Sequence, residues 1–376
     1  MSGRLVIGCM TGTSIDGLDA ALVRVEGSGL GMRAAFVRGL SREFLPELGG
    51  ALRDLAEQRP ATAEAVARAN QALTLLHAEV VSELMGGAGG AVVLVCVHGQ
   101  TVFHQPPVSW QMFNPGLLAQ RVGVPVVCDL RQGDLAAGGQ GAPITPLADW
   151  VLFRSATERR GVVNLGGFCN ATVLGPGGDA VPGSISGGDI CVCNNLLDAV
   201  ARRVMGVRFD QDGASAAGAE PDADATDDLL GILTAQRAKA GRRSLGTGDE
   251  VASWIGRHWR GGAGLSGATL AASACEGIGQ TIAEATRRVD RVLLAGGGVR
   301  NRALVRAIAS CASAAVETTG SVGVPVEFRE AVCFAVLGAL CADGVPITLP
   351  GATGVGVAPI AGVWAGVGVG VGVKVT

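Results

Sequence analysis

The chain contains the same order of elements twice: a short apolar strand, a turn of glycine and small polar residues, and a second apolar strand. The first copy is Ile7–Leu22 (IGCMTGTSIDGLDAAL) and the second is Gly161–Gly175 (GVVNLGGFCNATVLG). Helical spacing and further buried strands follow each copy. A repeated supersecondary pattern of this kind predicts two related α/β lobes around a cleft. The length of 376 residues is sufficient for two lobes, each with its own core.

The segments between these copies predict the remaining elements. RLVIGCM, LDAALVRVEG and MRAAFVRGLS read as an antiparallel meander. Helical spacing is found at residues 61–85, 115–122, 195–205, 266–289 and 329–341. The acidic stretch 219–227 predicts a solvated loop. We therefore expect a first lobe over residues 1–140, a second over 141–365 and a Gly/Val-rich tail over 366–376.

Composition excludes several classes of partner. The net charge is −3 and there is no basic stripe, which argues against nucleic acid. The uncharged stretch 351–373 is long enough for a membrane span, but it is rich in glycine, so a tail or weak β-edge is the better interpretation and no membrane partner is expected. Ten scattered cysteines lack any zinc spacing, and Cys191 and Cys193 alone do not make a metal site. Buried free thiols in a reducing cytoplasm are expected.

The turn TGTSIDG carries the first candidate site. Gly12 and Gly17 allow backbone N–H groups to approach a ligand, and neighbouring hydroxyls add donors, so the turn can hold an anion such as a phosphate. Asp16 or Asp19 could hold Mg²⁺ directly or through water. The alternative is a tight hairpin that caps itself with its own polar side chains.

Two further glycine turns follow apolar strands: NLGGFCN at residues 164–170 and LLAGGGVRN at residues 293–301. The second precedes a helix, a geometry suited to a nucleotide over a helix N-terminus. GxxxxGK[ST] is absent from the chain and neither of these two turns reads GxGxxG, which argues against a Walker-type or Rossmann-type site at them. Together the three turns are consistent with a nucleotide held between lobes.

Carboxylates supply the remaining chemistry. Asp189 in SGGDICVCNNLLD stands before a predicted helix and is either a helix cap or a general base. Asp129, Arg131 and Asp134 lie in the Gly-rich stretch DLRQGDLAAGGQGAP, which suits a sugar or a metal, or is a solvated loop.

The motifs MTGTSIDGLDAAL, HGQTVFHQP, DLRQGDLAAGGQGAP, NLGGFCNAT, AGGGVRN and EFREAVCFA occur in one order along the chain. With them the chain resembles the anhydro-N-acetylmuramic acid kinases of the sugar kinase/Hsp70/actin superfamily, over about Val6 to Gly366. The resemblance implies two RNase H-like lobes around a central cleft. It also implies a cytoplasmic homodimer that uses ATP and Mg²⁺ to open a 1,6-anhydrosugar with water and to phosphorylate O6, in the recycling of cell-wall muropeptides.

The resemblance also implies roles for individual residues. Asp189 would be the catalytic base that activates water. The implied nucleotide-binding residues are Gly12, Thr13, Ser14, Ile15, Asp16, Gly17, Leu18, Asp19, Gly166, Gly167, Gly296, Gly297, Gly298 and Asn301. The implied sugar-binding residues are His98, Gln100, Thr101, Asp129, Arg131 and Glu330.

The chain departs from the family pattern at three places. The family's Asp-Thr-Gly-Pro-Gly-Asn reads Asp189-Ile-Cys-Val-Cys-Asn194, and Ile190 and Val192 are poor residues wherever positive φ is needed. The family's PPKSTGRE is altered at residues 241–250, and the aspartate of QIGDP is Asn114. Two alternatives therefore stay open: a levoglucosan-type anhydrosugar kinase, and a catalytically impaired ATP-binding homologue.

Overall fold

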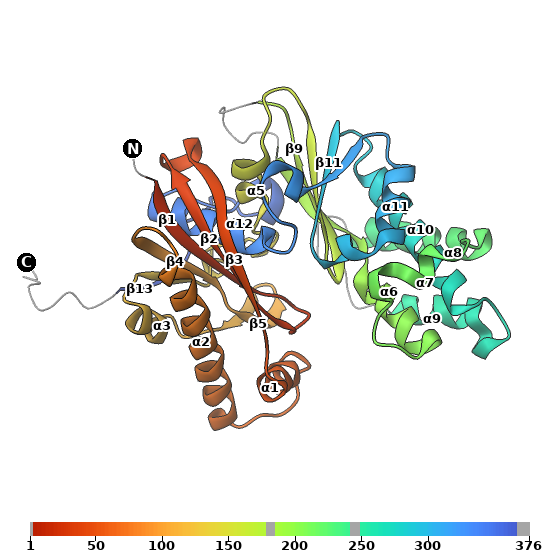
Figure 1. Cartoon of the computed structure of the whole chain (residues 1–376), viewed down its shortest axis with the longest axis horizontal. Helices are drawn as coiled ribbons and strands as arrows, with labels where there is room; N and C mark the ends of the chain where they lie inside the picture. Colours follow the sequence, from red (N-terminus) through yellow and green to blue (C-terminus); the bar gives the residue numbers. More distant parts are fainter. Residues whose placement is uncertain (1–2, 178–184, 241–248, 367–376) are drawn as a thin grey trace, which may run out of the picture. The chain divides into compact units, whose positions relative to one another are not determined.

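The computed structural model describes residues 3–177, 185–240 and 249–366. Contacts divide the chain into two compact units, Met1–Leu152 with Phe328–Thr376 and Phe153–Glu327. Each unit is built on one mixed sheet with helices (Figure 1).

Unit 1 contains both ends of the described chain. Its main sheet is formed by β1 (Arg4–Thr11), β2 (Gly17–Glu26), β3 (Arg33–Glu43), β4 (Val92–His98), β7 (Val126–Cys128) and β13 (Val363–Ala365). A separate hairpin joins β5 (Gln100–Gln105) to β6 (Val108–Met112). The helices are α1 (Pro46–Ala56), α2 (Ala63–Gly86), α3 (Pro115–Val122), α4 (Gln132–Ala136), α5 (Pro146–Phe153), α12 (Arg329–Ala342) and α13 (Pro350–Thr353).

Unit 2 holds the middle of the chain. Its sheet is formed by β8 (Arg160–Leu165), β9 (Phe168–Leu174), β10 (Ile185–Val192), β11 (Arg291–Ala295) and β12 (Ala315–Thr318). The helices are α6 (Asn194–Val200), α7 (Ala214–Ala217), α8 (Ala223–Ala240), α9 (Asp249–Trp259), α10 (Gly267–Ala285) and α11 (Arg302–Cys311).

The two sheets share one topology. The orders are β13-β7-β4-β1-β2-β3 and β10-β9-β8-β11-β12, so each unit places its first strand between its second and fourth. The first three strands of each sheet are antiparallel, and the next two run parallel to the first. This is the RNase H-like order, and the predicted α/β class with two RNase H-like lobes is confirmed.

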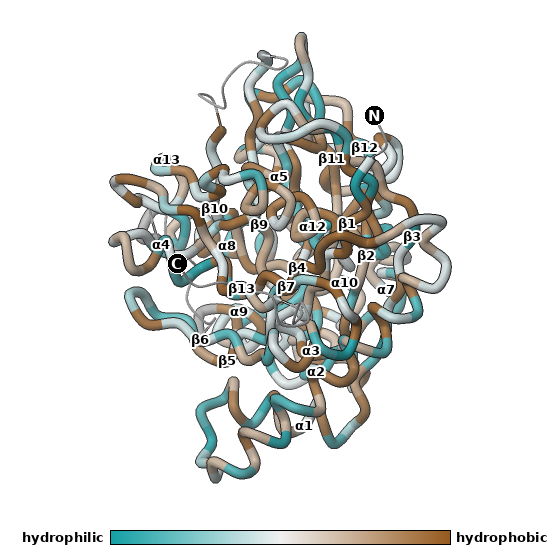
Figure 2. Tube along the Cα trace, turned by 90° about the vertical axis from the view of Figure 1, so that its left-hand side faces the viewer, coloured by the Kyte–Doolittle hydropathy of each residue, from teal (hydrophilic) through white to brown (hydrophobic). Residues whose placement is uncertain are grey.

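Helices α2 and α12 cover opposite faces of the unit 1 sheet. Ile7 and Cys9 of β1 belong to the same core cluster as Val80 and Leu84 of α2. Gly8 faces the other way, and a Cβ at this position would lie 1.9 Å from the Ala331 carbonyl oxygen of α12. Strands β4 and β7 both have a neighbouring strand on each side and are almost entirely hydrophobic, as their brown colour in Figure 2 shows.

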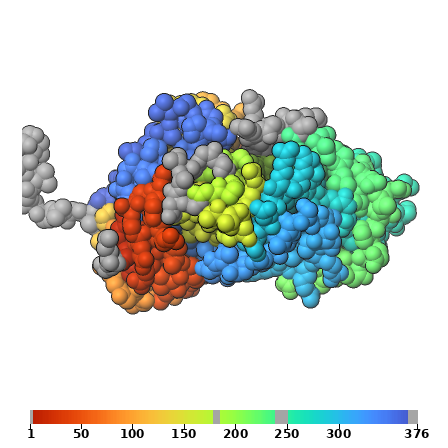
Figure 3. Space-filling view, turned by 90° about the horizontal axis from the view of Figure 1, so that it is seen from above, coloured from red at the N-terminus to blue at the C-terminus, as the bar shows by residue number. Residues whose placement is uncertain are grey.

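The unit boundaries differ from the predicted division at residue 140. Helix α5 stays with unit 1, and residues 328–366 return to it. The reason is long-range packing: α12 lies on β1, and β13 pairs with β7. Figure 3 shows the red N-terminal segment beside the dark blue segment near residue 350, consistent with the ion pair between Arg4 and Asp343. Most of the tail, residues 367–376, lies outside the described residues.

Other expectations have mixed outcomes. All ten cysteines are free thiols and all but Cys311 are buried, as expected. The predicted solvated loop at 219–227 is wrong in its second half, because α8 begins at Ala223 after an Asp222 side chain that caps it through the Ala225 N–H. Within the described part of the chain, no helix is both long and apolar enough to cross a membrane.

Candidate active site

The β1–β2 turn presents polar groups at the end of β1. Thr13, Ser14 and Asp16 are exposed, and the Ser14 hydroxyl donates to Asp16 Oδ1 at 2.8 Å. Among the described residues, no acceptor is found for the N–H groups of Thr13 and Ser14. Consecutive free N–H groups of this kind are suited to binding an anion.

The backbone of this turn is held by its buried members. Ile15 has φ of 52°, a conformation that costs a β-branched residue about 1–3 kcal/mol. Its side chain packs in a core cluster with Leu52 and Leu73, and its carbonyl accepts from Arg53 Nη2 at 3.2 Å. These contacts offset the strain and fix the turn.

Three predicted phosphate-binding residues have structural roles. The side chains of Ile15 and Leu18 are buried in the core, so only their backbone could meet a ligand. A Cβ at Gly17 would lie 2.6 Å from the Arg42 carbonyl oxygen, so the close approach of β3 accounts for this glycine. Gly12 is different, because the nearest atom to a Cβ at that position would be Ser14 Oγ, at 3.3 Å.

A row of side chains crosses the unit 1 sheet on the α12 face. Register places Ser41, Asp19, Met10 and His98 side by side across β3, β2, β1 and β4. The Ser41 hydroxyl donates to Asp19 Oδ1, which orients that carboxylate. The row brings predicted nucleotide-binding and sugar-binding residues, Asp19 and His98, onto one surface.

His98 is the centre of a polar network. It is 4% exposed, and its Nε2 accepts from Gln111 Nε2 at 2.6 Å and from Arg131 Nη2 at 3.1 Å. Burial, and then the Arg131 charge, hold the pKa of His98 well below its usual value, so the ring is neutral with its proton on Nδ1. Gln111 Nε2 also lies 3.4 Å from Thr101 Oγ1. The hairpin β5–β6 is therefore linked to the segment that follows β7.

This network contains unsatisfied buried polar atoms. Hydrogen-bond partners are absent among the described residues for His98 Nδ1, Gln100 Oε1, Gln111 Oε1, Asp129 Oδ1 and Arg131 Nε. Each such atom costs about 1–3 kcal/mol unless water or a ligand supplies the partner. Five of them on the residues of this network, one belonging to the Arg131 guanidinium itself, indicate a site that receives a polar ligand.

Three carboxylates act electrostatically on the Arg131 guanidinium. Burial lowers its pKa to about 10, and the carboxylates of Glu330, Asp129 and Asp134 oppose that shift. Burial raises the pKa of Asp129 and of Glu330, while Arg131 lowers both. Asp129 follows β7 with φ of 50°, a strained conformation for a side chain held beside the guanidinium. The structure thus brings together His98, Asp129, Arg131 and Glu330, four of the residues for which the resemblance implies sugar binding.

Gln100 and Asp134 occupy positions around this cluster. Gln100 Nε2 donates to the Gly12 carbonyl at 3.2 Å, which connects the hairpin to the β1–β2 turn. Asp134 is fully buried in α4, where it accepts from the Gly141 N–H at 2.7 Å and from Thr353 Oγ1 at 2.7 Å. The solvated-loop interpretation of residues 129–143 is therefore wrong for this carboxylate.

Gln111 was not among the predicted site residues, and the structure gives Asn114 a local role. Gln111 precedes the altered QIGDP position by three residues, and only the hairpin fold places it against His98. Asn114 caps α3, with Oδ1 accepting from the Leu117 N–H at 3.1 Å. Asparagine and aspartate cap helices equally well, so this departure preserves the local structure.

Unit 2 carries a second polar row. Register places Asp189 of β10 beside Asn170 of β9, and Asn170 beside Asn164 of β8. A register shift follows between Asp189 and Cys191. Asp189 is half-buried within β10, and α6 follows at Asn194 with Cys193 at its N-cap, so the alternative that Asp189 caps the helix is wrong. Asn170 is a further member of this row that sequence reasoning did not single out.

The altered stretch after Asp189 extends β10. Ile190 and Val192 lie in the strand, and positive φ is not found at either of these described residues, so the expected backbone conflict does not arise. Cys191 and Cys193 are buried in the unit 2 core. The N–H groups of Cys193, Asn194 and Asn195 donate to the carbonyls of Gly166 and Gly167. These bonds occupy the N-terminus of α6 and fix both segments together.

The third glycine turn connects β11 to α11. Gly296 has φ of 84° and lies against Asn164, whose buried Oδ1 has no hydrogen-bond partner among the described residues. Gly298 packs on Leu165, whereas a Cβ at Gly297 would meet open space. Asn301 caps α11 through the Leu304 N–H at 3.0 Å. Gly297 is therefore the member of this turn with room for a ligand.

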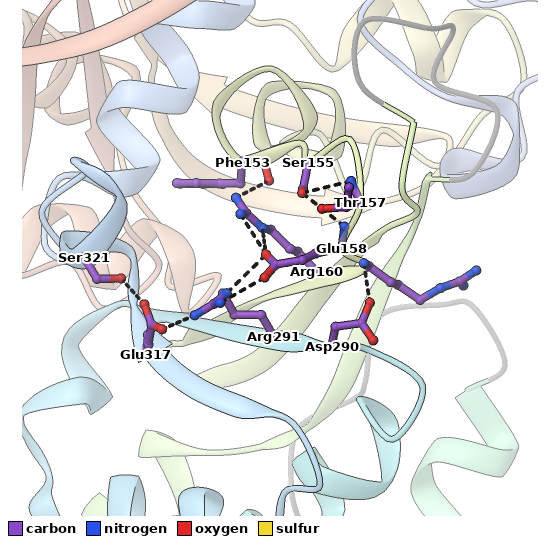
Figure 4. Close-up of polar contacts among 10 residues, drawn as sticks. Phe153, Ser155, Thr157, Glu158, Arg160, Asp290, Arg291, Glu317 and Ser321 are labelled. Atoms are coloured by element: carbon purple, nitrogen blue, oxygen red, sulfur yellow. Dashed lines mark hydrogen bonds and ion pairs between the residues drawn. The ribbon is translucent and has the colours of Figure 1, made fainter.

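Ion pairs lie at the end of the unit 2 sheet that is away from the glycine turns (Figure 4). Arg291, the first residue of β11, contacts both Glu158 and Glu317, and Glu158 also accepts from Arg160 Nε at 2.9 Å. Hydrogen bonds from Arg291 and Arg160 lower the pKa of Glu158 to about 2. This network holds the amino ends of the strands, while the glycine turns lie at their carboxyl ends.

Comparison with known proteins identifies a family. The model of the family described as anhydro-N-acetylmuramic acid kinase matches residues 4–365. The anhydro-N-acetylmuramic acid kinase of Salinibacter ruber is 35% identical, over 94% of this chain and 94% of that protein. The enzyme of that name from Bordetella pertussis is 36% identical, over 96% of this chain and 95% of that protein. The one from Gloeobacter violaceus is 33% identical, over 95% of this chain and 97% of that protein.

Solved structures show weaker similarity. The activator of the 2-hydroxyisocaproyl-CoA dehydratase from Clostridium difficile with bound ADPNP covers 89% of this chain and 94% of its own, with 12% identity and a TM-score of 0.46. The match to a ROK family glucokinase from Streptomyces griseus in complex with glucose and AMPPNP covers 89% of this chain and 99% of that chain, with 15% identity and a TM-score of 0.40. The family model and the curated relatives carry the assignment: the chain belongs to the anhydro-N-acetylmuramic acid kinase family.

Proposed function

We propose that this protein is an ATP-dependent kinase that opens 1,6-anhydro-N-acetylmuramic acid with water and phosphorylates O6, giving N-acetylmuramic acid 6-phosphate in cell-wall recycling. Family membership over residues 4–365 supports the reaction. The main support for a sugar site is the set of five unsatisfied buried polar atoms, one on each of His98, Gln100, Gln111, Asp129 and Arg131. A sugar hydroxyl can donate and accept, so a sugar can satisfy donors and acceptors of this mixed set.

The proposed reaction divides between the two units. Water forms a bond to C1 as the C1–O6 bond breaks, and the water proton passes to the Asp189 carboxylate. O6 forms a bond to the γ-phosphorus of ATP as the bond from that phosphorus to the β,γ-bridging oxygen breaks, and ADP leaves. Arg131, with His98, Gln100, Thr101, Asp129 and Glu330, binds and orients the sugar.

We assign the ATP phosphates to the β1–β2 turn, with Thr13 and Ser14 N–H groups as donors. The adenosine would lie at the turn beginning with Gly296, where Gly297 leaves open space. Phosphoryl transfer depends mainly on positioning and charge neutralisation, which these groups provide.

The proposal includes Mg²⁺, which would neutralise phosphate charge. Within the described residues, no group of three His, Cys, Asp or Glu side chains could hold a metal. Mg²⁺ in kinases is commonly bound by one or two carboxylates together with phosphates and water, so Asp16 and Asp19 fit that role. Ser14 and Ser41 hydroxyls orient these two carboxylates.

The test is a coupled ATP-turnover assay with 1,6-anhydro-N-acetylmuramic acid and levoglucosan, with product masses measured. We expect a higher kcat/KM for the amino sugar and a product heavier than the substrate by one water and one phosphoryl unit (HPO3). A higher kcat/KM for levoglucosan would assign the other anhydrosugar branch. No turnover of either would reject kinase activity; the relatives do not favour these alternatives.

The proposal also includes a cytoplasmic location, where ATP is available, and a homodimer. Sedimentation equilibrium of the purified protein tests the dimer. A mass of about twice 37.8 kDa is expected, and a single 37.8 kDa species would reject it.

A further inference from the structure

A fully buried ion pair stands beside the sugar site. Arg329, the first residue of α12, donates through Nε to Asp149 Oδ1 of α5 at 2.9 Å, and its Nη2 contacts Asp149 Oδ2. The side chains are 2% and 0% exposed. Arg329 Nη2 also lies 3.4 Å from Thr145 Oγ1, and Cys333 Sγ lies 3.6 Å from Asp149 Oδ1.

Such a pair is a weak source of stability. Desolvating two charges offsets most of their attraction, and well-packed apolar residues often replace a buried pair without loss. Its two-pronged geometry does fix orientation, because a planar guanidinium meets both carboxylate oxygens. The pair is therefore better explained by the orientation that it gives to the start of α12 than by a contribution to stability.

Glu330 is the next residue on that helix. Charged groups act on it from several elements: Arg329 on its own helix, Asp149 on α5, Asp19 on β2 and Arg131 after β7. Two neutral titratable groups also lie in this region: the Cys333 thiol on α12, and the His98 ring on β4, whose centroid is 4.8 Å from that of Phe334 on α12. The first turn of α12 sets where this carboxylate lies relative to Arg131.

We infer that Asp149 and Arg329 are positioning residues, which lock the first turn of α12 so that Glu330 faces Arg131 in the sugar site. The inference rests on the proposed function for its kinetic consequence. Its structural content, the placement and ionisation of Glu330, does not depend on turnover.

The two halves of the pair act on Glu330 with opposite sign. Arg329 lowers the pKa of Glu330, whereas Asp149 raises it. Asp149→Asn should therefore shift the Glu330 titration to lower pH, and Arg329→Gln should shift it to higher pH. Because removing either charge has this electrostatic effect by itself, opposite shifts show that both groups lie beside Glu330, and Arg329→Lys separates the charge from the positioning.

The first measurement is the titration of the Glu330 side chain by NMR in ¹³C-glutamate-labelled protein, assigned with Glu330→Gln. Opposite shifts in the two single variants support the inference, and coincident titrations overturn it. If either single variant fails to fold, the double variant Asp149→Leu/Arg329→Met keeps the volume apolar. In this double variant Glu330 should titrate at higher pH than in the parent, because Arg329 has a larger effect than Asp149 on Glu330.

The second measurement is kinetic. The Asp149 and Arg329 variants should raise KM for the anhydrosugar at least about tenfold at neutral pH while kcat changes little, as expected when a binding contact is lost. Arg329→Lys keeps the charge but not the two-pronged contact, and should recover part of the loss.

The other end of α12 supplies a matched control. Asp343 caps this helix and pairs with Arg4 through two contacts of 2.6 and 2.9 Å. Asp343→Asn should lower stability without moving KM or the Glu330 titration. An equal effect on KM from this control would overturn the inference. Absence of parental turnover with opposite NMR shifts would reject the proposed function and leave the inference standing.

Discussion

Arg131 Nη2 lies 3.1 Å from Nε2 of His98, and both residues keep a further buried nitrogen without a partner among the described residues. A cation can donate to an imidazole only if that imidazole is neutral, so the contact fixes the protonation state of His98. The same guanidinium donates to the Gly141 carbonyl at 2.6 Å. Arg131 therefore joins the β4 end to the loop after α4 while leaving Nε available to a ligand.

Replacing Arg131 should separate binding from folding. Arg131→Met keeps the length of the side chain and removes its donors, so KM for the anhydrosugar should rise at least about tenfold. Because the Arg131 charge lowers the pKa of His98, the variant should also titrate His98 at higher pH. Steady-state kinetics and imidazole NMR check both effects. Unchanged KM and an unchanged His98 titration would refute the role of Arg131.

The β1–β2 turn offers two glycines with different predicted outcomes. Gly12→Val should weaken Mg-ATP binding at least about tenfold with little change in Tm, because the added atoms meet only Ser14. Gly17→Ala should lower Tm, because its Cβ would meet the Arg42 carbonyl oxygen. Calorimetric titration and thermal unfolding measure the pair. If Gly12→Val binds ATP as the parent does, the phosphates do not lie at this turn.

His77 should make stability depend on pH. Burial lowers its pKa from 6.5 to about 4, although its hydrogen bond to the Leu73 carbonyl opposes the shift. The unfolded state therefore binds the proton more readily between these values, and stability falls as pH drops from about 6.5 to 4. A shift of this size corresponds to about 3 kcal/mol.

His77→Leu tests this linkage. Between pH 7 and pH 4, the unfolding free energy measured by urea titration should fall by about 3 kcal/mol less in the variant than in the parent. His98 contributes equally to both proteins and cancels in the comparison. Parallel stability curves for parent and variant would exclude His77 as the source.

Local pattern was enough for much of the fold. The doubled strand–turn–strand motif predicted two units of one topology, and the helical spacing at 115–122 matches α3 at both ends. Periodicity reports which face of an element is buried, so it works where elements are regular and amphipathic.

Long-range contacts were beyond such reasoning. The burial of Asp134 depends on Thr353, and the ion pair of Arg329 depends on Asp149, 180 positions away. Asp189 was misplaced for a local reason: Ile190 and Val192 are β-branched and continue the strand, whereas the resemblance suggested a turn. The sugar-site residues were named from the resemblance, and the structure places three of them, His98, Asp129 and Glu330, around the guanidinium of a fourth, Arg131.

The most direct test of the account is the turnover of Asp189→Asn with 1,6-anhydro-N-acetylmuramic acid and Mg-ATP. The amide keeps the shape of the side chain in β10 and removes the base. Because positioned general bases contribute on the order of 10²–10⁴-fold, kcat should fall by about that factor, with the Kd for ATP nearly unchanged. A kcat within a few-fold of the parent would contradict the account, because another group would then accept the proton from water.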